Sequence, residues 1–176
     1  MRFFRPGLLL LGVLAVAGCS NPRFEPHTDA DGKFTANFPG KVKTETRSQP
    51  SEVGMLTLKM VGAETRRPNV AYMVGYFDIP RGAFYDFDKA TEGVKKNNQA
   101  TVTESRDFKA WGVSGREVQF AIEKPKKGNI CLRMFIHDNR MYQVMVVGAN
   151  VTLSSSQVQE FFNSFKLNST QATPTR

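Results

Sequence analysis

Cys131 and His137 are the residues of this chain whose types could support nucleophilic catalysis. A thiolate beside an imidazole attacks carbonyl groups when the two side chains lie within hydrogen-bonding distance. Here they lie six residues apart in the strand-like run ICLRMFIH. An extended strand rises about 3.3 Å per residue, which separates them by roughly 20 Å. We therefore predict no catalytic dyad and no enzyme, and we interpret Cys131 as a small buried hydrophobic residue.

The residues from Asp29 to Gly32 read DADG, like the beginning of a calcium-binding loop. In such a loop the glycine occupies the sixth position and a glutamate the twelfth. Here the glycine comes fourth and Gly40 stands at the twelfth position. We expect a tight turn and predict no metal site. The glycines of the chain also form no phosphate-binding pattern, so no cofactor is predicted.

Cys19 ends an apolar run near the N-terminus. Arg2 and Arg5 precede an uncharged segment from Pro6 to Gly18. As a helix with a rise of about 1.5 Å per residue, this segment would span roughly 20 Å, which is less than the ~30 Å hydrocarbon core of a bilayer. A basic start, a short apolar run and small residues at the end are typical of a secretory signal peptide.

The tetrapeptide VAGC at Val16–Cys19 resembles the bacterial lipobox. The resemblance implies that residues 1–18 are removed and that Cys19 becomes the lipidated first residue, with acyl chains such as palmitate. More than one chain gives a stable anchor, because a single chain binds a membrane reversibly. Ser20 stands where an aspartate would signal inner-membrane retention, which favours the outer membrane, facing the periplasm. The alternative is ordinary signal cleavage, with Cys19 left as a free thiol or disulfide partner.

Lysine and arginine exceed the acidic residues, and the formal net charge is +8. Basic groups occur at Arg66–Arg67, Lys95–Lys96 and Lys124–Lys127, all at predicted turns or helix ends. We interpret them as solvated surface residues. The alternative is contact with anionic lipid headgroups or with an acidic partner. No basic helix or aromatic-basic motif is present, so nucleic acid is not an expected partner.

The remaining chain is predicted to form one domain. Residues 19–31 are expected to be a flexible tether behind the lipidated cysteine, residues 32–167 a globular α+β domain, and residues 168–176 a disordered polar tail. Apolar periodicity predicts strands near residues 34–38, 53–64, 69–80, 100–108, 113–124, 129–136 and 140–149. Because the run at 69–80 is apolar on both faces, it predicts a central strand.

Two helices are predicted, near residues 85–97 and within residues 153–167. The second has Val158, Phe161, Phe162 and Phe165 at helical spacing, and its serines and glutamines have the spacing of a capping box. This order of elements predicts an α+β fold with a largely antiparallel sheet of about six to seven strands and two main helices.

Several short patterns together resemble the PsbP-like α/β/α sandwich of small bacterial lipoproteins, the DcrB-type proteins among them. The matching positions are Phe34, Phe38, Pro39 and Gly40; Tyr72, Val74, Tyr76, Asp78 and Pro80; Gly115, Val118 and Phe120; Arg133, Phe135, Ile136, Asn139, Arg140, Tyr142, Gln143, Val144 and Val146; and Phe161, Phe162, Ser164, Phe165, Lys166 and Leu167. The resemblance implies the fold and a non-enzymatic accessory or binding role, without naming a partner.

These observations leave two functional hypotheses. The first is a lipid-anchored binding or interaction module of the cell envelope, which holds a protein partner or an apolar ligand. Its candidate interaction surface includes Trp111, Arg140 and Tyr142, because aromatic residues and arginine dominate interaction hot spots. The second is a structural or stress-related envelope protein without a discrete binding site. A concave apolar pocket with convergent polar groups would favour the first hypothesis.

Overall fold

The protein is described by a computed structural model that covers residues 23–51, 54–66 and 68–168. The predicted signal peptide, Cys19 and the predicted tail from residue 169 lie outside these residues. In chain order, the elements are β1 (Glu25–Asp29), β2 (Phe34–Phe38), β3 (Lys43–Ser51), β4 (Gly54–Arg66), β5 (Asn69–Asp78), α1 (Phe87–Asn97), β6 (Ala100–Ala110), β7 (Val113–Ile122), β8 (Gly128–His137), β9 (Arg140–Gly148), α2 (Ser156–Ser164) and β10 (Lys166–Leu167).

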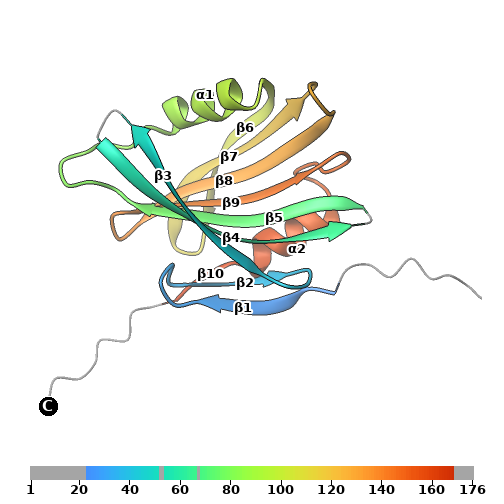
Figure 1. The fold of residues 1–176 in the computed structure, drawn as a ribbon, viewed down its shortest axis with the longest axis horizontal. Coiled ribbons are helices and arrows are strands. Elements are labelled where there is room, and N and C mark those ends of the chain that lie inside the picture. The colour runs from blue at the N-terminus through green and yellow to red at the C-terminus, as the bar shows by residue number, and fades with distance from the viewer. Residues whose placement is uncertain (1–22, 52–53, 67, 169–176) are drawn as a thin grey trace, which may run out of the picture.

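Two antiparallel sheets form the frame of the molecule (Figure 1). The large sheet has seven strands in the order β3-β4-β5-β9-β8-β7-β6. A smaller sheet has the order β1-β2-β10. The α+β class, the largely antiparallel sheet and the two helices are therefore confirmed. β5 lies between β4 and β9, as its apolar faces predict.

Each face of the large sheet is covered by a different layer (Figure 1). Helix α1 covers one face, where Phe120, Leu132 and Met134 are buried. Helix α2 and the small sheet cover the other face, where an aromatic cluster surrounds Tyr72 and Tyr142. The second layer is thus part helix and part sheet, whereas the α/β/α resemblance implied helices on both sides. Neither helix within the described residues has the length and apolar character to cross a bilayer.

Helix α2 buries the predicted apolar stripe, because Val158, Phe161 and Phe162 are fully inaccessible to solvent. The predicted capping box is wrong. The N-cap residue is Ser155, whose hydroxyl accepts a hydrogen bond from the Thr152 N–H (2.9 Å) and caps no helix N–H. The Ser155 hydroxyl thus stabilises the preceding turn instead of the helix.

The expectation of a flexible tether through Asp31 is also wrong in part. Glu25–Asp29 form β1, which pairs along its whole length with β2. The chain there is polar and carries a proline, so no local pattern marks it as a strand. The open edge of β2 supplies the backbone hydrogen bonds that order it. Strand β3, at the edge of the large sheet, is also polar, so no local pattern predicted it as a strand.

The predicted disordered tail is ordered at its first residue, because the Asn168 N–H donates to the Lys33 carbonyl (2.8 Å).

Candidate functional site

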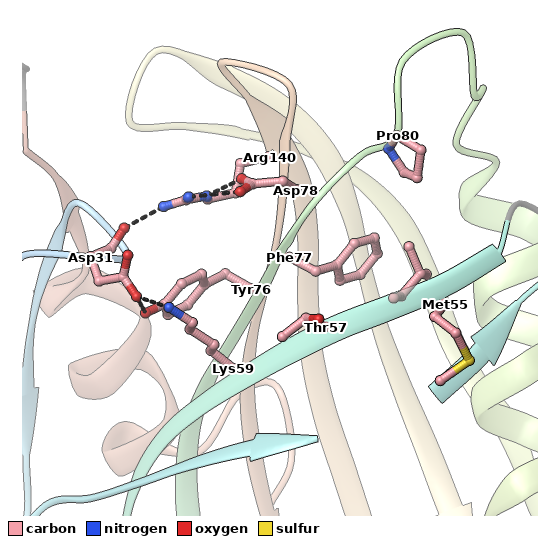
Figure 2. Close-up of a pocket in the computed structure, with 10 residues that line it drawn as sticks. Asp31, Met55, Thr57, Lys59, Tyr76, Phe77, Asp78, Pro80 and Arg140 are labelled. Atoms are coloured by element: carbon pink, nitrogen blue, oxygen red, sulfur yellow. Dashed lines mark hydrogen bonds and ion pairs between the residues drawn. The ribbon is translucent and has the colours of Figure 1, made fainter. Parts of the chain in front are cut away.

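A groove of about 320 Å³ opens where β5 ends and β9 begins, beside the β1–β2 turn (Figure 2). It lies over the part of the large sheet that the small sheet leaves open. Its lining combines charged and apolar side chains from β4, β5, β9 and that turn: Asp31, Met55, Leu56, Thr57, Lys59, Tyr76, Phe77, Asp78, Pro80 and Arg140.

The charged wall is organised around Arg140. Its guanidinium donates two hydrogen bonds to the carboxylate of Asp78, from Nε to Oδ1 (2.6 Å) and from Nη2 to Oδ2 (3.2 Å). Its Nη1 donates to the backbone carbonyl of Asp31. The same guanidinium carbon lies 5.2 Å from the centre of the Tyr76 ring. Arg140 therefore connects two strands of the large sheet to the β1–β2 turn.

The β1–β2 turn is held by its own aspartates. The Asp29 carboxylate accepts hydrogen bonds from the Gly32 N–H (2.5 Å) and from the Tyr76 hydroxyl (3.0 Å). Asp31 forms an ion pair with Lys59 of β4. A Cβ at Gly32 would lie 2.7 Å from ring atoms of Tyr76 and Phe34, which favours glycine there. The DADG run is thus a tight turn, and the described residues contain no group of three acidic, histidine or cysteine side chains suited to a metal ion.

These contacts shift the ionisation of both groove carboxylates in the same direction. The hydrogen bond from Arg140 lowers the pKa of Asp78 below its ordinary value of 3.8. The hydrogen bond from Lys59 does the same to the pKa of Asp31. Conversely, the Asp78 carboxylate raises the pKa of Arg140. Both carboxylates consequently stay ionised at neutral pH, and they present negative charge beside Arg140 in the groove.

The opposite wall is apolar. Leu56, Phe77 and Pro80 line it, and Met55 at the start of β4 is 65% exposed. Phe84, in the loop between β5 and α1, is 90% exposed. Large exposed apolar side chains beside a groove are typical of interaction sites, and methionine adapts its shape to different surfaces.

A second hollow of about 160 Å³ lies on the other side of the Arg140–Asp78 pair. Its lining residues include His137 at the end of β8 and Asp138 of the β8–β9 turn, together with Lys33 and Asn168. Asp78 and Arg140 therefore line both hollows.

The three residues that the sequence indicated as an interaction surface lie in different environments. Arg140 is in the groove wall. Tyr142 is only 1% exposed, and its hydroxyl donates to the Gly32 carbonyl (2.9 Å). Trp111, in the β6–β7 turn, packs its ring 4.8 Å from that of Phe165. The structure thus gives Trp111 and Tyr142 packing positions and places Arg140 in the wall of the groove.

Of the groove residues, only Arg140 was predicted as part of an interaction surface, and those that sequence reasoning missed include Asp31, Lys59 and Met55. Only the DADG run carried a local signal, and it predicted a turn rather than a site. Lys59 and Met55 lie on one face of β4, and no feature of that strand alone indicates that the turn of another sheet stands opposite.

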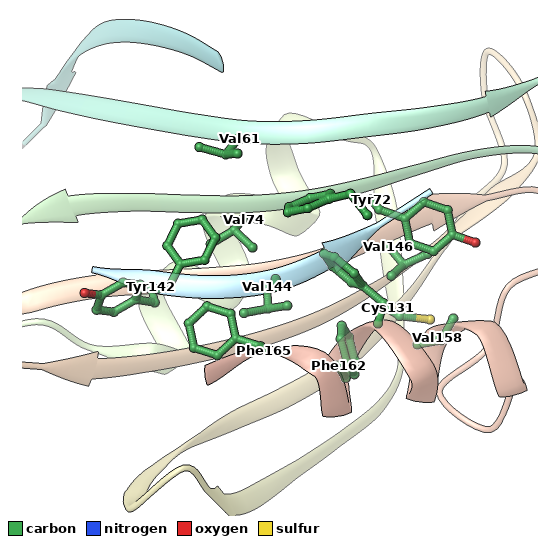
Figure 3. Packing of buried hydrophobic residues seen from close by; sticks show 14 of the residues in the cluster. Val61, Tyr72, Val74, Cys131, Tyr142, Val144, Val146, Val158, Phe162 and Phe165 are labelled. Atoms are coloured by element: carbon green, nitrogen blue, oxygen red, sulfur yellow. The ribbon is translucent and has the colours of Figure 1, made fainter. Parts of the chain in front are cut away.

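Cys131 is fully buried among Tyr72, Val146, Phe162 and their neighbours in the aromatic cluster (Figure 3). Burial raises the pKa of its thiol to about 12. His137 lies at the far end of β8, in the smaller hollow. The prediction that Cys131 is a buried packing residue is confirmed.

The fold of this chain is similar to that of a solved structure. The solution structure of the cyanobacterial PsbP protein CyanoP, from Synechocystis sp. PCC 6803, superposes with a TM-score of 0.57. The fold is PsbP-like. The superposition covers 89% of this chain and 98% of CyanoP, at 12% sequence identity. At this identity the PsbP-like likeness concerns the fold alone. No protein-family model and no curated protein sequence matches the chain.

Proposed function

We propose that this protein is a lipid-anchored accessory module of the bacterial cell envelope that faces the periplasm and binds a protein partner in the groove beside Arg140. The role is non-enzymatic. The VAGC tetrapeptide before Cys19 supports the anchor, with the outer membrane favoured by Ser20. The lining of the groove is the observation that supports binding. An apolar wall with exposed Met55 lies opposite a charged wall.

The lining favours a protein segment over a purely apolar ligand. Small-molecule sites are enclosed and mostly apolar, with few polar groups. Here Asp31, Lys59, Asp78 and Arg140 contribute four charged side chains to the wall. Covering them with an apolar ligand would remove their hydration without replacement, which is costly. A peptide that places an apolar side chain against Met55 and a polar group near the Arg140–Asp78 pair would satisfy both walls.

The anchor is tested by intact-mass spectrometry of the full chain purified from bacterial membranes, beside Cys19→Ser. The expected wild-type mass begins at residue 19 and includes two or three acyl chains, whereas the variant lacks them. An unmodified wild-type mass would overturn the anchor and make Cys19 a free thiol or a disulfide partner.

The groove is tested by photo-cross-linking in cells, with a photoreactive amino acid at Thr57 in the groove or at exposed Ser105 on β6 as the matched control. We expect a discrete protein adduct from Thr57, absent from Ser105, and lost when Met55→Asp is added. Met55 is exposed, so this change leaves the core intact. Equal labelling from both positions, or none, would overturn the groove as the binding site.

The alternative, a structural or stress-related protein without a discrete site, gives a different result. In that case Met55→Asp leaves the function of the protein in the envelope unchanged, while Cys19→Ser abolishes it.

A further inference from the structure

The two ends of the large sheet differ in which loops they carry. We call one the anchor end, defined by the row of paired residues Thr65, Val70, Gly148, Asn129, Ala121 and Thr101. It carries the β4–β5 turn, the β7–β8 turn and the last turn of α1. The other is the groove end, where Asp78 pairs with Arg140. It carries the β8–β9 turn, the β6–β7 turn and the β1–β2 turn.

The N-terminal chain enters the described structure at the anchor end. Glu25, the first residue of β1, pairs with Phe38, the last residue of β2. The ring of Phe24 packs edge-on against Tyr72, near the start of β5 (5.3 Å between centroids). Figure 1 shows that β1 begins on the side of the β4–β5 turn. Arg23 is four residues beyond Cys19, which limits the connection to about 14 Å.

Charge is divided between the two ends. Among the described residues, the basic side chains at the anchor end are Arg23, Lys41, Lys43, Arg66, Lys95, Lys96, Lys124, Lys126 and Lys127, against Glu25, Glu64, Glu92 and Glu123. The groove end holds every aspartate of the chain, namely Asp29, Asp31, Asp78, Asp86, Asp88, Asp107 and Asp138, beside Lys33, Lys59, Arg81, Lys89, Lys109, Arg116, Arg140 and Lys166. The anchor end is therefore net positive and the groove end is close to neutral.

We propose that the anchor end docks on anionic lipid headgroups and thereby holds the groove away from the membrane. The proposal rests on the lipid anchor of the proposed function. That anchor would limit the separation of the basic end from the surface to at most about 14 Å, so the basic side chains can approach within the Debye length of about 8 Å at physiological salt. Each cation near an anionic surface contributes on the order of fivefold in affinity.

The docked orientation places the groove in the periplasm. β5 runs from the anchor end to the groove end over ten residues, which at about 3.3 Å per residue is roughly 33 Å. The groove then faces soluble or membrane-distant protein partners, and lipid headgroups do not reach it.

The test uses the full lipidated protein in vesicles of phosphatidylcholine, with or without 30% phosphatidylglycerol. A fluorophore is attached at Asn97→Cys, at the anchor end, or at Phe84→Cys, near the groove end. Cys131 is buried with a pKa of about 12, so it does not compete for labelling. Nitroxide-headgroup lipids report how close each fluorophore lies to the surface.

With phosphatidylglycerol we expect the Asn97 probe to be quenched several-fold more than the Phe84 probe, and 1 M NaCl to reduce the difference. The triple reversal Lys124→Glu, Lys126→Glu and Lys127→Glu should abolish it. The matched reversal Arg81→Glu, Lys109→Glu and Lys166→Glu, with the same change in net charge, should leave it intact. Equal quenching of both probes, or indifference to the first reversal, would overturn the proposal. If the anchor end binds an acidic protein and not the membrane, one of these two results is expected.

Failure of the anchor is distinguished by the intact mass. If the wild-type mass shows no lipid, the same full chain is sedimented with the two kinds of vesicle. At least tenfold preference for anionic vesicles that is lost in the first triple reversal supports docking without an anchor. The absence of such a preference overturns docking as well.

Discussion

Arg140 and Asp78 are direct cross-strand neighbours on β9 and β5, and their side chains form a two-bond ion pair with donor–acceptor distances of 2.6 and 3.2 Å. The third contact of Arg140, to the Asp31 carbonyl, reaches the β1–β2 turn. One guanidinium thus fixes the small sheet against the large sheet at the edge of the groove, and its side chain is only 16% exposed.

Arg140→Met should lower the free energy of unfolding by about 2 kcal/mol, because hydrogen bonds to charged groups each contribute about 1.5–3 kcal/mol. Arg140→Lys should recover only part of the loss, since an ammonium group cannot reproduce the paired geometry. Urea unfolding measures both. Arg81→Met, on an exposed loop, is the control and should change stability by less than about 0.5 kcal/mol. Equal stability of Arg140→Met and wild type would contradict the clamp.

Acid should destabilise the groove end. The pKa values of Asp78 and Asp31 are lowered in the folded protein, so the unfolded chain binds protons first as the pH falls. Their contribution is complete above about pH 5 and is lost as the pH falls through 3.8 and then through the lowered folded values. We expect the Tm to fall between pH 5 and pH 2. Asp78→Asn should show a lower Tm at pH 7 and a smaller decrease; an identical pH profile would contradict the assignment.

Glu117 on β7 is 1% exposed and lies between Arg106 and Arg133. Its Oε1 accepts from Arg106 Nε (2.7 Å) and its Oε2 from Arg133 Nε (2.5 Å). Glu117→Ala should cost about 3 kcal/mol, because it leaves the largely buried Arg133 without its carboxylate. The control, Glu104→Ala, removes a half-exposed partner of Arg106 and should cost less than about 1 kcal/mol. The double change Glu117→Leu, Arg133→Met should recover stability relative to Glu117→Ala in chemical denaturation.

Gly115 and Gly93 provide a matched pair for the same substitution. A Cβ at Gly115 would lie 2.1 Å from the Met134 carbonyl oxygen on the neighbouring strand, whereas at Gly93 on α1 it would meet nothing within 4 Å. Gly115→Ala should therefore destabilise the protein by about 3 kcal/mol or separate β7 from β8. Gly93→Ala should stabilise it by about 0.5–1 kcal/mol, because alanine reduces the entropy of the unfolded helix segment. Thermal unfolding of both variants measures these effects, and an unchanged Tm for Gly115→Ala would contradict the need for a close approach between residue 115 and the Met134 carbonyl oxygen.

The central elements of the fold were predictable because their signals are local. Tyr72 and Val74 alternate on the face of a strand, and Phe161 and Phe162 fall on one side of a helix. Such side chains must be buried whichever residues they contact, so the spacing and the composition of apolar residues are sufficient to predict these elements. Strands β1 and β3 were not predictable, because they are polar and are ordered by backbone hydrogen bonds to the open edges of β2 and β4. Only the tertiary structure places those edges beside them.

The sequence by itself determined the strands and helices of the core and the buried state of Cys131. It also determined the chemistry of the N-terminal tetrapeptide, from which a lipid anchor is inferred. Only the tertiary structure decided that Asp31, Lys59 and Arg140 meet at one groove, since they belong to three elements joined by pairing across two sheets. It also decided that lysines from separate turns share one end with the N-terminal chain. The physical reason is that charge and contact act through space, and the antiparallel register sets which distant residues become neighbours.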